Sequence, residues 1–261
     1  MIDLRCGDCL ELMKDIQDGS VDLVLTDPPY GTTACKWDSI IPLEPMWGQL
    51  NRIIKPNGAI CLFGSEPFSS ALRMSNIKNY RYDWIWHKNL SGSFATAKKM
   101  PMKYHENISV FYKKLPTYNP QFQHYSESTV KRFKDGEMVN RKKQMEKSTN
   151  SIQGGLSFVG EQGMCIKRGK YPESVQFFKS EHTANGKRLH PTQKPIDLLE
   201  YFIRTYTNEG ETVLDFTMGS GSTGVACVNT KRNFIGIELD EGYFQIAKQR
   251  IENCNKKDST F

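Results

Sequence analysis

The 261-residue sequence has no long apolar run, and this excludes one class of protein at once. No stretch approaches the roughly 18 consecutive apolar residues that a membrane-spanning helix needs. The first residues also lack the basic stretch followed by an apolar stretch that marks an export signal. We therefore expect a cytoplasmic protein that has no membrane partner.

Cysteine and histidine follow no metal-binding pattern. The seven cysteines are an odd number without framework spacing, which favours reduced thiols over disulfides. Cys6 and Cys9 form a C-x-x-C pair, but no second pair and no H-x3-H motif completes a zinc site. The five histidines are scattered along the chain. We therefore predict no metal site.

Positive charge is concentrated in one part of the chain. The net charge is +6, yet residues 98–188 hold 18 Lys and Arg against 8 Asp and Glu, a balance of +10. Aromatic residues such as Tyr104, Phe122 and Tyr171 are interspersed in this block. Cations that contact phosphates, mixed with rings that stack on bases, are typical of a nucleic-acid surface. The alternative is an ordinary solvated face.

Short apolar runs alternate with helical patterns, which predicts an α/β fold with a parallel sheet. We expect strands at 21–26, 59–63, 82–86, 108–112, 212–215 and 233–238, and helices at 46–54, 67–75, 196–206, 223–230 and 241–253. Residues 56–58 are expected to form a turn before the second strand. From about 116 to 187 the periodicity fails, so the α/β pattern is interrupted there.

The segment Asp27-Pro28-Pro29-Tyr30 directly follows the predicted strand 21–26 and is the most informative motif. Two consecutive prolines remove two backbone donors and fix φ at about −65°, so the loop is stiff. It can present the Asp27 carboxylate and the Pro28 carbonyl as acceptors beside the flat ring of Tyr30. These groups suit the exocyclic amine of adenine or cytosine. The alternative is an ordinary turn that ends at prolines.

A glycine-rich segment follows the predicted strand 212–215. Gly219, Gly221 and Gly224 satisfy G-x-G-x-x-G, and Glu238 ends the next predicted strand. In a nucleotide-binding βαβ unit the glycines let the backbone approach the ligand, and the acid accepts hydrogen bonds from the ribose hydroxyls. The segment therefore predicts an adenosine-type cofactor.

The glycine motif alone leaves two cofactors open, because NAD satisfies the same geometry as S-adenosylmethionine. A dehydrogenase needs an acid/base group beside the nicotinamide, and no residue indicates one. The D-P-P-Y motif has no role in hydride transfer, whereas a methyl donor such as S-adenosylmethionine requires an acceptor such as an amine. The two motifs together therefore favour methyl transfer to an amino group.

These motifs resemble those of the DNA amino methyltransferases, in the permuted order called the β class. In that family the catalytic tetrapeptide comes first, then a target-recognition region, then the glycine motif. Four further segments match in type and position: Gly7–Glu11, Trp84–Lys88, Tyr104–Ile108 and His190–Pro195. The resemblance implies a Rossmann-like S-adenosylmethionine-dependent methyltransferase fold, with a mostly parallel sheet, helices on both faces and an inserted target-recognition region.

The same resemblance implies a role for each motif residue. The catalytic residues would be Asp27, Pro28, Pro29 and Tyr30. Asp8 would bind the adenine of the cofactor, Glu238 its ribose, and Thr192 with Lys194 its methionyl end. Gly219 and Gly221 would pass under that end. The expected cofactor-binding set is completed by Cys9, Asp27, Asp215, Phe216, Ser220 and Leu239.

The resemblance also divides the chain into three parts. Residues 1–112 would be the catalytic half of the methyltransferase domain, 113–188 the target-recognition region, and 189–261 the cofactor-binding half. One departure stands out: the family usually has Asp-Pro-Phe before the glycines, whereas this chain has Asp215-Phe216-Thr217. The ring near the cofactor is thus displaced by one position or lost, which puts the cofactor affinity in question.

The expected reaction is methylation of adenine N6 in double-stranded DNA, with the base flipped out of the helix because a stacked base cannot reach the cofactor. Family members that act on cytosine N4 more often have Ser at the position of Asp27, so adenine is favoured and cytosine is the alternative. A non-catalytic DNA-binding relative is a further alternative. Family members are often homodimers, but the sequence identifies neither an interface nor a partner restriction endonuclease.

Overall fold

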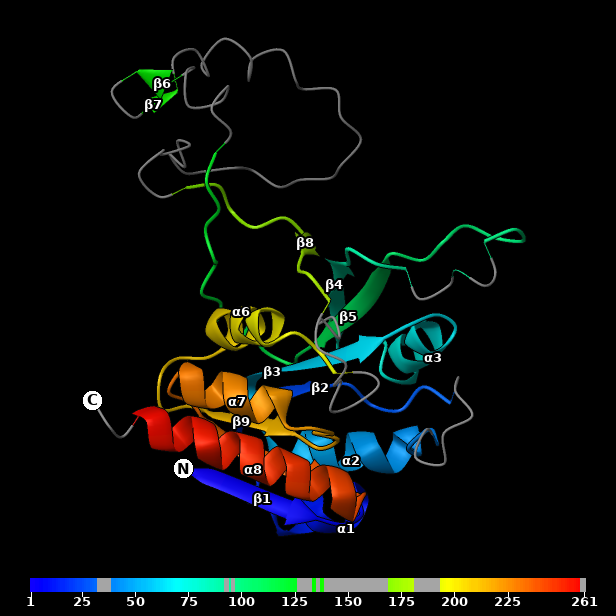
Figure 1. Cartoon of the computed structure of the whole chain (residues 1–261), viewed down its shortest axis with the longest axis vertical. Helices are drawn as coiled ribbons and strands as arrows, with labels where there is room; N and C mark the ends of the chain where they lie inside the picture. The colour runs from blue at the N-terminus through cyan, green and yellow to red at the C-terminus, as the bar shows by residue number, and fades with distance from the viewer. Residues whose placement is uncertain are drawn as a thin grey trace. The chain divides into compact units, whose positions relative to one another are not determined.

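The computed structural model describes residues 1–31, 39–91, 94, 97–125, 133–134, 137–138, 169–180 and 193–258 (Figure 1). The chain divides into two compact units, Met1–Asn119 with Ser174–Phe261, and Pro120–Glu173. In the second unit the described residues include the short antiparallel pair β6 (Phe133–Lys134) and β7 (Glu137–Met138). No helix within these described ranges is both long and apolar enough to span a bilayer.

The first unit contains an eight-stranded sheet and the helices that cover it. Its strands are β1 (Ile2–Cys6), β2 (Val21–Thr26), β3 (Ile54–Gly64), β4 (Tyr80–His87), β5 (His105–Phe111), β8 (Val175–Phe177), β9 (Thr212–Asp215) and β10 (Asn233–Glu238). Within its described residues the helices are α1 (Cys9–Leu12), a 3-10 turn (Met13–Asp15), α2 (Leu43–Ile53), α3 (Phe68–Ser75), α6 (Ile196–Tyr206), α7 (Ser222–Asn229) and α8 (Glu241–Asp258).

The sheet has the strand order β1-β10-β9-β2-β3-β5-β4-β8. Every neighbouring pair is parallel except the two pairs that contain β5, which runs against β3 and β4. The prediction of a mostly parallel sheet is therefore confirmed. Because β2, β9 and β10 are parallel neighbours, their carboxyl ends, Thr26, Asp215 and Glu238, meet at one edge of the sheet.

Two apolar layers lie on opposite faces of the sheet, as the alternation of side chains along a strand requires. On β2, Leu23 and Leu25 belong to the layer that contains α6, α7 and α8, whereas Val24 belongs to the layer that contains α1, α2 and α3. All six residues of β2 are buried, which fits a central strand covered by helices on both faces. The expected helices on both faces are confirmed.

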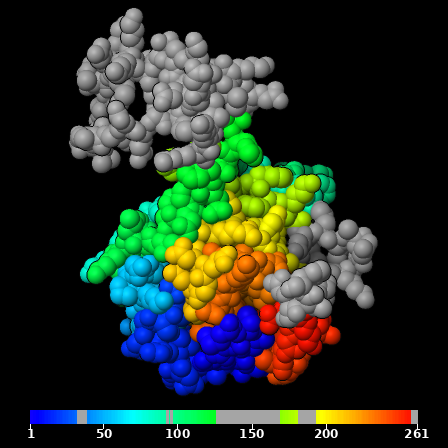
Figure 2. Space-filling view, turned by 90° about the vertical axis from the view of Figure 1, so that its left-hand side faces the viewer, coloured from blue at the N-terminus to red at the C-terminus, as the bar shows by residue number. Residues whose placement is uncertain are grey.

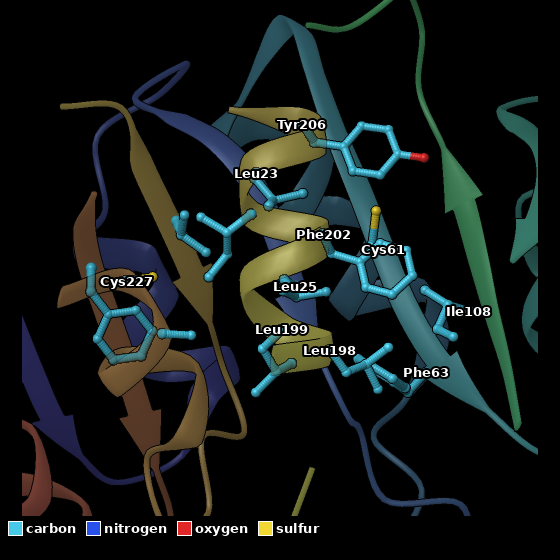
Figure 3. Packing of buried hydrophobic residues seen from close by; sticks show 14 of the residues in the cluster. Leu23, Leu25, Cys61, Phe63, Ile108, Leu198, Leu199, Phe202, Tyr206 and Cys227 are labelled. Carbon is cyan, nitrogen blue, oxygen red and sulfur yellow. The ribbon is translucent and has the colours of Figure 1, made fainter. Parts of the chain in front are cut away.

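Helix α6 shows how the sequence pattern fixes one of these layers. Its buried side chains include Leu198, Phe202 and Tyr206, spaced four residues apart on one stripe, and Figure 3 shows these side chains lying along the sheet. The hydroxyl of Tyr206 accepts a hydrogen bond of 2.7 Å from the indole of Trp84, so its polar end is satisfied in the core. Burial of each such side chain contributes roughly 1.5–3 kcal/mol.

Several elements differ from those predicted. The expected turn at residues 56–58 lies inside β3, whose register against β2 shifts between Val21 and Leu23. Strands β1 and β8 were not predicted, and both occupy edges of the sheet. β1 pairs with β10, so the N-terminal and C-terminal segments lie next to each other, as the blue and red surfaces in Figure 2 show. β8 returns the chain to the sheet directly after the second unit.

Candidate active site

A pocket of about 370 Å³ lies where the carboxyl ends of β2, β9 and β10 meet, and we call it the strand-end pocket. Parallel α/β sheets generally bind ligands at this edge. The predicted site residues that line it are Asp8, Cys9, Asp27, Pro28, Pro29, Tyr30, Lys194, Asp215, Phe216, Gly219, Ser220, Glu238 and Leu239. The D-P-P-Y and glycine motifs, far apart in the sequence, thus share one cavity.

Asp27 begins the loop after β2 and is held by two donors. The hydroxyl of Tyr30 donates to its Oδ1, and the ammonium of Lys194 donates to its Oδ2. The Tyr30 ring stacks on Phe68, with centroids 5.1 Å apart and planes at 27°. Burial raises the pKa of the Asp27 carboxyl, even though Lys194 acts in the opposite direction. The loop therefore presents a carboxylate and an aromatic ring that are both oriented by neighbours.

Lys194, which was predicted to lie at the cofactor, is buried and paired with two carboxylates. Its Nζ contacts Asp27 and lies 3.3 Å from Oε2 of Glu106. It also lies 5.2 Å from the centre of the Phe63 ring. Burial alone would lower the pKa of Lys194, but Asp27 and Glu106 together raise it above its ordinary value. Lys194 is therefore a cation in this pocket.

Asp215 joins the two motifs through threonine hydroxyls. Its Oδ1 accepts a bond of 2.6 Å from Thr26, and its Oδ2 accepts one of 2.6 Å from Thr223 on α7. Burial raises the pKa of Asp215 to about 6. The hydroxyl of Thr217 lies 2.7 Å from that of Thr26 and donates to the backbone carbonyl of Asp27 at 3.2 Å. A threonine at this position thus ties the glycine segment to the D-P-P-Y loop.

Glu238, at the end of β10, has both carboxylate oxygens fixed by backbone amides. Gly219 donates to Oε2 at 2.8 Å and Asp240 donates to Oε1 at 2.9 Å. Burial raises the pKa of Glu238, although these amide bonds favour its charged form. Each oxygen has further acceptor capacity, because a carboxylate offers about four lone-pair sites. A pair of vicinal hydroxyls is therefore a suitable partner for this group.

Gly221, unlike Gly219, does not line the strand-end pocket. It caps the N-terminus of α7 with φ at +78°. A Cβ at this position would lie 2.9 Å from the Cβ of Ala247 on α8. Its neighbour Ser220 does line the pocket, and the guanidinium of Arg250 donates to the Ser220 carbonyl at 2.5 Å. Gly221 therefore shapes the loop rather than the wall of the cavity.

The segment at the start of α1 forms another wall of the strand-end pocket. Asp8 caps α1, because its Oδ1 accepts the amides of Leu10 at 2.7 Å and Glu11 at 3.3 Å. Cys9 is buried beside it, and burial raises the pKa of its thiol to about 12, so it stays protonated near neutral pH. Leu239 is 63% exposed at the rim, whereas the ring of Phe216 is buried.

Thr192 lies outside the residues that the structure describes, so its predicted place beside the cofactor stays a prediction. The structure adds pocket residues that the motifs did not indicate: Thr26, Phe63, Gln193, Thr217, Met218, Ser222, Thr223 and Tyr243. Gln193 adjoins Lys194 in the matched segment 190–195, which was the signal that could have identified it. Phe63 and Tyr243 lie in an apolar strand and an amphipathic helix, where nothing in the pattern separates a pocket residue from a core residue.

Comparison with known proteins agrees with this geometry. Residues 21–249 match the family model of the N6/N4 DNA methylases. The chain is 28% identical over 265 residues to the Type II methyltransferase M.HpaI of Haemophilus parainfluenzae, covering 96% of this chain and 74% of that protein. It is 27% identical over 259 residues to the DNA adenine methyltransferase YhdJ of Escherichia coli, covering 94% and 81% of the two chains.

The fold has a solved counterpart of comparable length. The crystal structure of the M1.HpyAVI complex with SAM superimposes with a TM-score of 0.63 at 27% identity, covering 96% of this chain and 99% of that one. The family match extends across both motifs and most of the sheet, and the motifs meet in one pocket. On these grounds the chain belongs to the N6/N4 family of DNA methylases.

Proposed function

We propose that this protein transfers a methyl group from S-adenosylmethionine to the exocyclic N6 of adenine in double-stranded DNA. The observation that carries the proposal is the convergence of the Asp27 carboxylate and the Glu238 carboxylate on the strand-end pocket. One suits an amino group on a planar ring, and the other suits a ribose. Enclosing both in a single cavity would bring the acceptor amine close to the methyl donor.

The polar groups of the strand-end pocket fit S-adenosylmethionine. Glu238 would accept hydrogen bonds from the ribose hydroxyls, and Asp8 would accept one from the adenine amine, since both bonds that it makes to backbone amides use Oδ1. Gly219 and Ser220 would lie under the methionyl end, with Thr192 and Lys194 beside it. When bound, the cofactor supplies an electrophilic methyl group on a sulfonium.

Asp27 and the Pro28 carbonyl would activate the exocyclic amine that receives the methyl group. The lone pair on an exocyclic amine is delocalised into the ring, so the amine is a weak nucleophile until its hydrogens are bonded by well-placed acceptors. Tyr30 and Lys194 hold the two oxygens of Asp27 in fixed positions, so little reorganisation is needed when the amine arrives. The carboxylate would also offset the positive charge that develops on nitrogen.

A flipped base would stack on Tyr30, whose ring is supported by Phe68. Flipping costs a few kcal/mol, and stacking on an aromatic ring returns on the order of 1–3 kcal/mol. Residues 113–188 would recognise the target; most of this range lies outside the described residues. Lysines and arginines in this basic block would contact phosphates, so DNA binding should weaken steeply with salt.

Adenine is proposed over cytosine because the chain has Asp at position 27. In the family, Ser is more common there in members that act on cytosine N4, which is the second candidate. The other alternative is a relative that binds DNA without catalysis. It is disfavoured because Asp27, Tyr30, Gly219 and Glu238 are all present and share the strand-end pocket.

The experiment that tests the proposal is incubation of the protein with methyl-labelled S-adenosylmethionine and unmethylated genomic DNA, followed by digestion and nucleoside mass spectrometry. We expect labelled N6-methyldeoxyadenosine. Labelled N4-methyldeoxycytidine instead would establish the second candidate. If calorimetry shows no binding of S-adenosylmethionine and no labelled nucleoside forms, the non-catalytic alternative would replace the proposal.

A further inference from the structure

Four charged side chains of alternating sign form a continuous row that ends at Asp27. Lys88 contacts Oε1 of Glu106 at 2.8 Å, and Lys194 lies 3.3 Å from the other oxygen of Glu106 while also contacting Asp27. Lys88 directly follows β4, Glu106 lies on β5, Lys194 precedes α6, and Asp27 follows β2. Four separate segments of the first unit therefore converge on one line of charge.

This row is buried to an extent unusual for surface ion pairs. The side chains of Lys88, Glu106, Lys194 and Asp27 are 16%, 17%, 9% and 18% exposed. Removing charges from water is costly, and a buried ion pair that loses one partner leaves an uncompensated charge behind. Glu106 is not among the residues that line the strand-end pocket, but it pairs with Lys194, which does line it.

We propose that Glu106 is a positioning residue for methyl transfer: it shares the ammonium of Lys194 with Asp27, and so fixes the place and acceptor strength of the Asp27 carboxylate. This inference rests on the proposed function. Without Glu106, Lys194 would be paired with Asp27 alone and would withdraw more of its negative charge. Lys88 pairs with the other oxygen of Glu106 and partly neutralises its charge.

The row predicts that Glu106 and Lys88, which Lys194 separates from Asp27, affect the Asp27 carboxylate in opposite directions. Among the described residues, the groups that act on the Asp27 carboxyl are Lys194, Glu106, the hydroxyl of Tyr30, and Asp215. Loss of the negative charge of Glu106 would make the Asp27 carboxylate easier to ionise. Loss of the positive charge of Lys88 would leave Glu106 less neutralised, and Asp27 would then be harder to ionise.

The test compares Glu106→Gln and Lys88→Gln with Glu200→Gln as the matched control. Glu200 on α6 has the same 17% side-chain exposure and pairs with Arg204 at 3.0 Å, but it does not line the pocket. Single-turnover methylation is measured as a function of pH with saturating DNA and cofactor, and the cofactor Kd is measured by calorimetry. The fall of the rate at low pH, which we call the acid limb, reports protonation of the Asp27 carboxylate.

We expect Glu106→Gln to lower the methylation rate about ten- to a hundred-fold, as misplacement of a reacting group does, and to move the acid limb to lower pH. Lys88→Gln should move it to higher pH, and Glu200→Gln should leave rate and limb unchanged. The cofactor Kd should stay close to the wild-type value in all three variants, since Glu106, Lys88 and Glu200 do not line the pocket.

The inference is overturned if Glu106→Gln keeps the wild-type rate and acid limb, or if both variants move the limb in the same direction, as a general loosening would. Should Glu106→Gln fail to fold, an unmoved limb in Lys88→Gln overturns it, and a limb at higher pH supports it. If the wild type and Glu200→Gln methylate DNA, an overturning result refutes only the role of Glu106 and leaves the proposed function standing. An inactive wild type would refute the proposed function and this role together.

Discussion

Replacement of Gly221 by alanine tests how the glycine segment is built. Gly221 has φ at +78°, a conformation that costs a residue with a Cβ about 1–2 kcal/mol. The added Cβ would also lie 2.9 Å from the Cβ and 3.0 Å from the Cα of Ala247, and such overpacking costs about 1–3 kcal/mol. The two effects together predict a loss of about 2–5 kcal/mol in the free energy of unfolding.

Gly210 provides a matched control for the backbone effect. It has φ at +81°, and a Cβ there would meet no atom within 4 Å. Gly210→Ala should therefore cost only the first contribution, about 1–2 kcal/mol. The difference between the two variants isolates the clash between the N-terminus of α7 and helix α8.

The assay is urea unfolding followed by circular dichroism, with calorimetric titration of S-adenosylmethionine on the folded variants. Gly221→Ala should also weaken cofactor binding several-fold, because it displaces the adjoining backbone of Ser220 in the pocket wall, whereas Gly210→Ala should not. Equal losses of stability in the two variants would refute the packing argument. An unchanged cofactor Kd in Gly221→Ala would refute the link between this loop and the pocket.

Three further predictions follow from the site. Glu238→Gln should weaken binding of S-adenosylmethionine at least about tenfold by calorimetry, since hydrogen bonds to a charged group contribute about 1.5–3 kcal/mol; an unchanged Kd would show that Glu238 does not hold the ribose. Burial raises the pKa of Asp215 to about 6, so its contribution to stability is fully present below its unfolded pKa of about 4 and is lost as pH rises through 6. Asp215→Asn should remove this pH dependence, so the difference between its free energy of unfolding and that of wild type should change by about 3 kcal/mol between pH 4 and 7 in urea titrations. A difference that stays constant over this pH range would contradict the raised pKa of Asp215. Tyr30→Phe, which keeps the ring but loses the bond to Asp27, should lower turnover less than Tyr30→Ala, and the alanine variant should lower turnover more than DNA affinity in a filter-binding assay; wild-type turnover in the alanine variant would be inconsistent with base stacking.

Much of the fold could be predicted from the sequence where periodicity is strong. The strand at Val21–Thr26 and the helix at Ile196–Tyr206 were predicted to the residue, because each is bounded by clear signals and its apolar pattern matches its burial. Strand β1 alternates polar and apolar residues over only five positions and lies at a sheet edge, so its pattern is weak. Strand β8 has three residues in a polar stretch, and its pairing with β4 is decided by tertiary contacts.

Only part of the site could likewise be predicted from the sequence. Most of the motif residues share the strand-end pocket, because strands that run in parallel bring their carboxyl ends to one edge, but Gly221 does not line it and Thr192 lies outside the described residues. The motifs did not predict that Thr217, where the family usually has a ring, would bond the Asp27 carbonyl. Nor did they predict that Glu106 would reach Lys194, since that contact joins β5 to a loop almost ninety residues later and leaves no trace in local spacing.

The proposed role of Asp27 is to accept a hydrogen bond from the target amine within the pocket that holds the methyl donor. Its most direct test is single-turnover methylation by Asp27→Ala, with cofactor binding measured on the same preparation. We expect the variant to bind S-adenosylmethionine and to form no labelled N6-methyldeoxyadenosine. Methylation at the wild-type rate by this variant would contradict it.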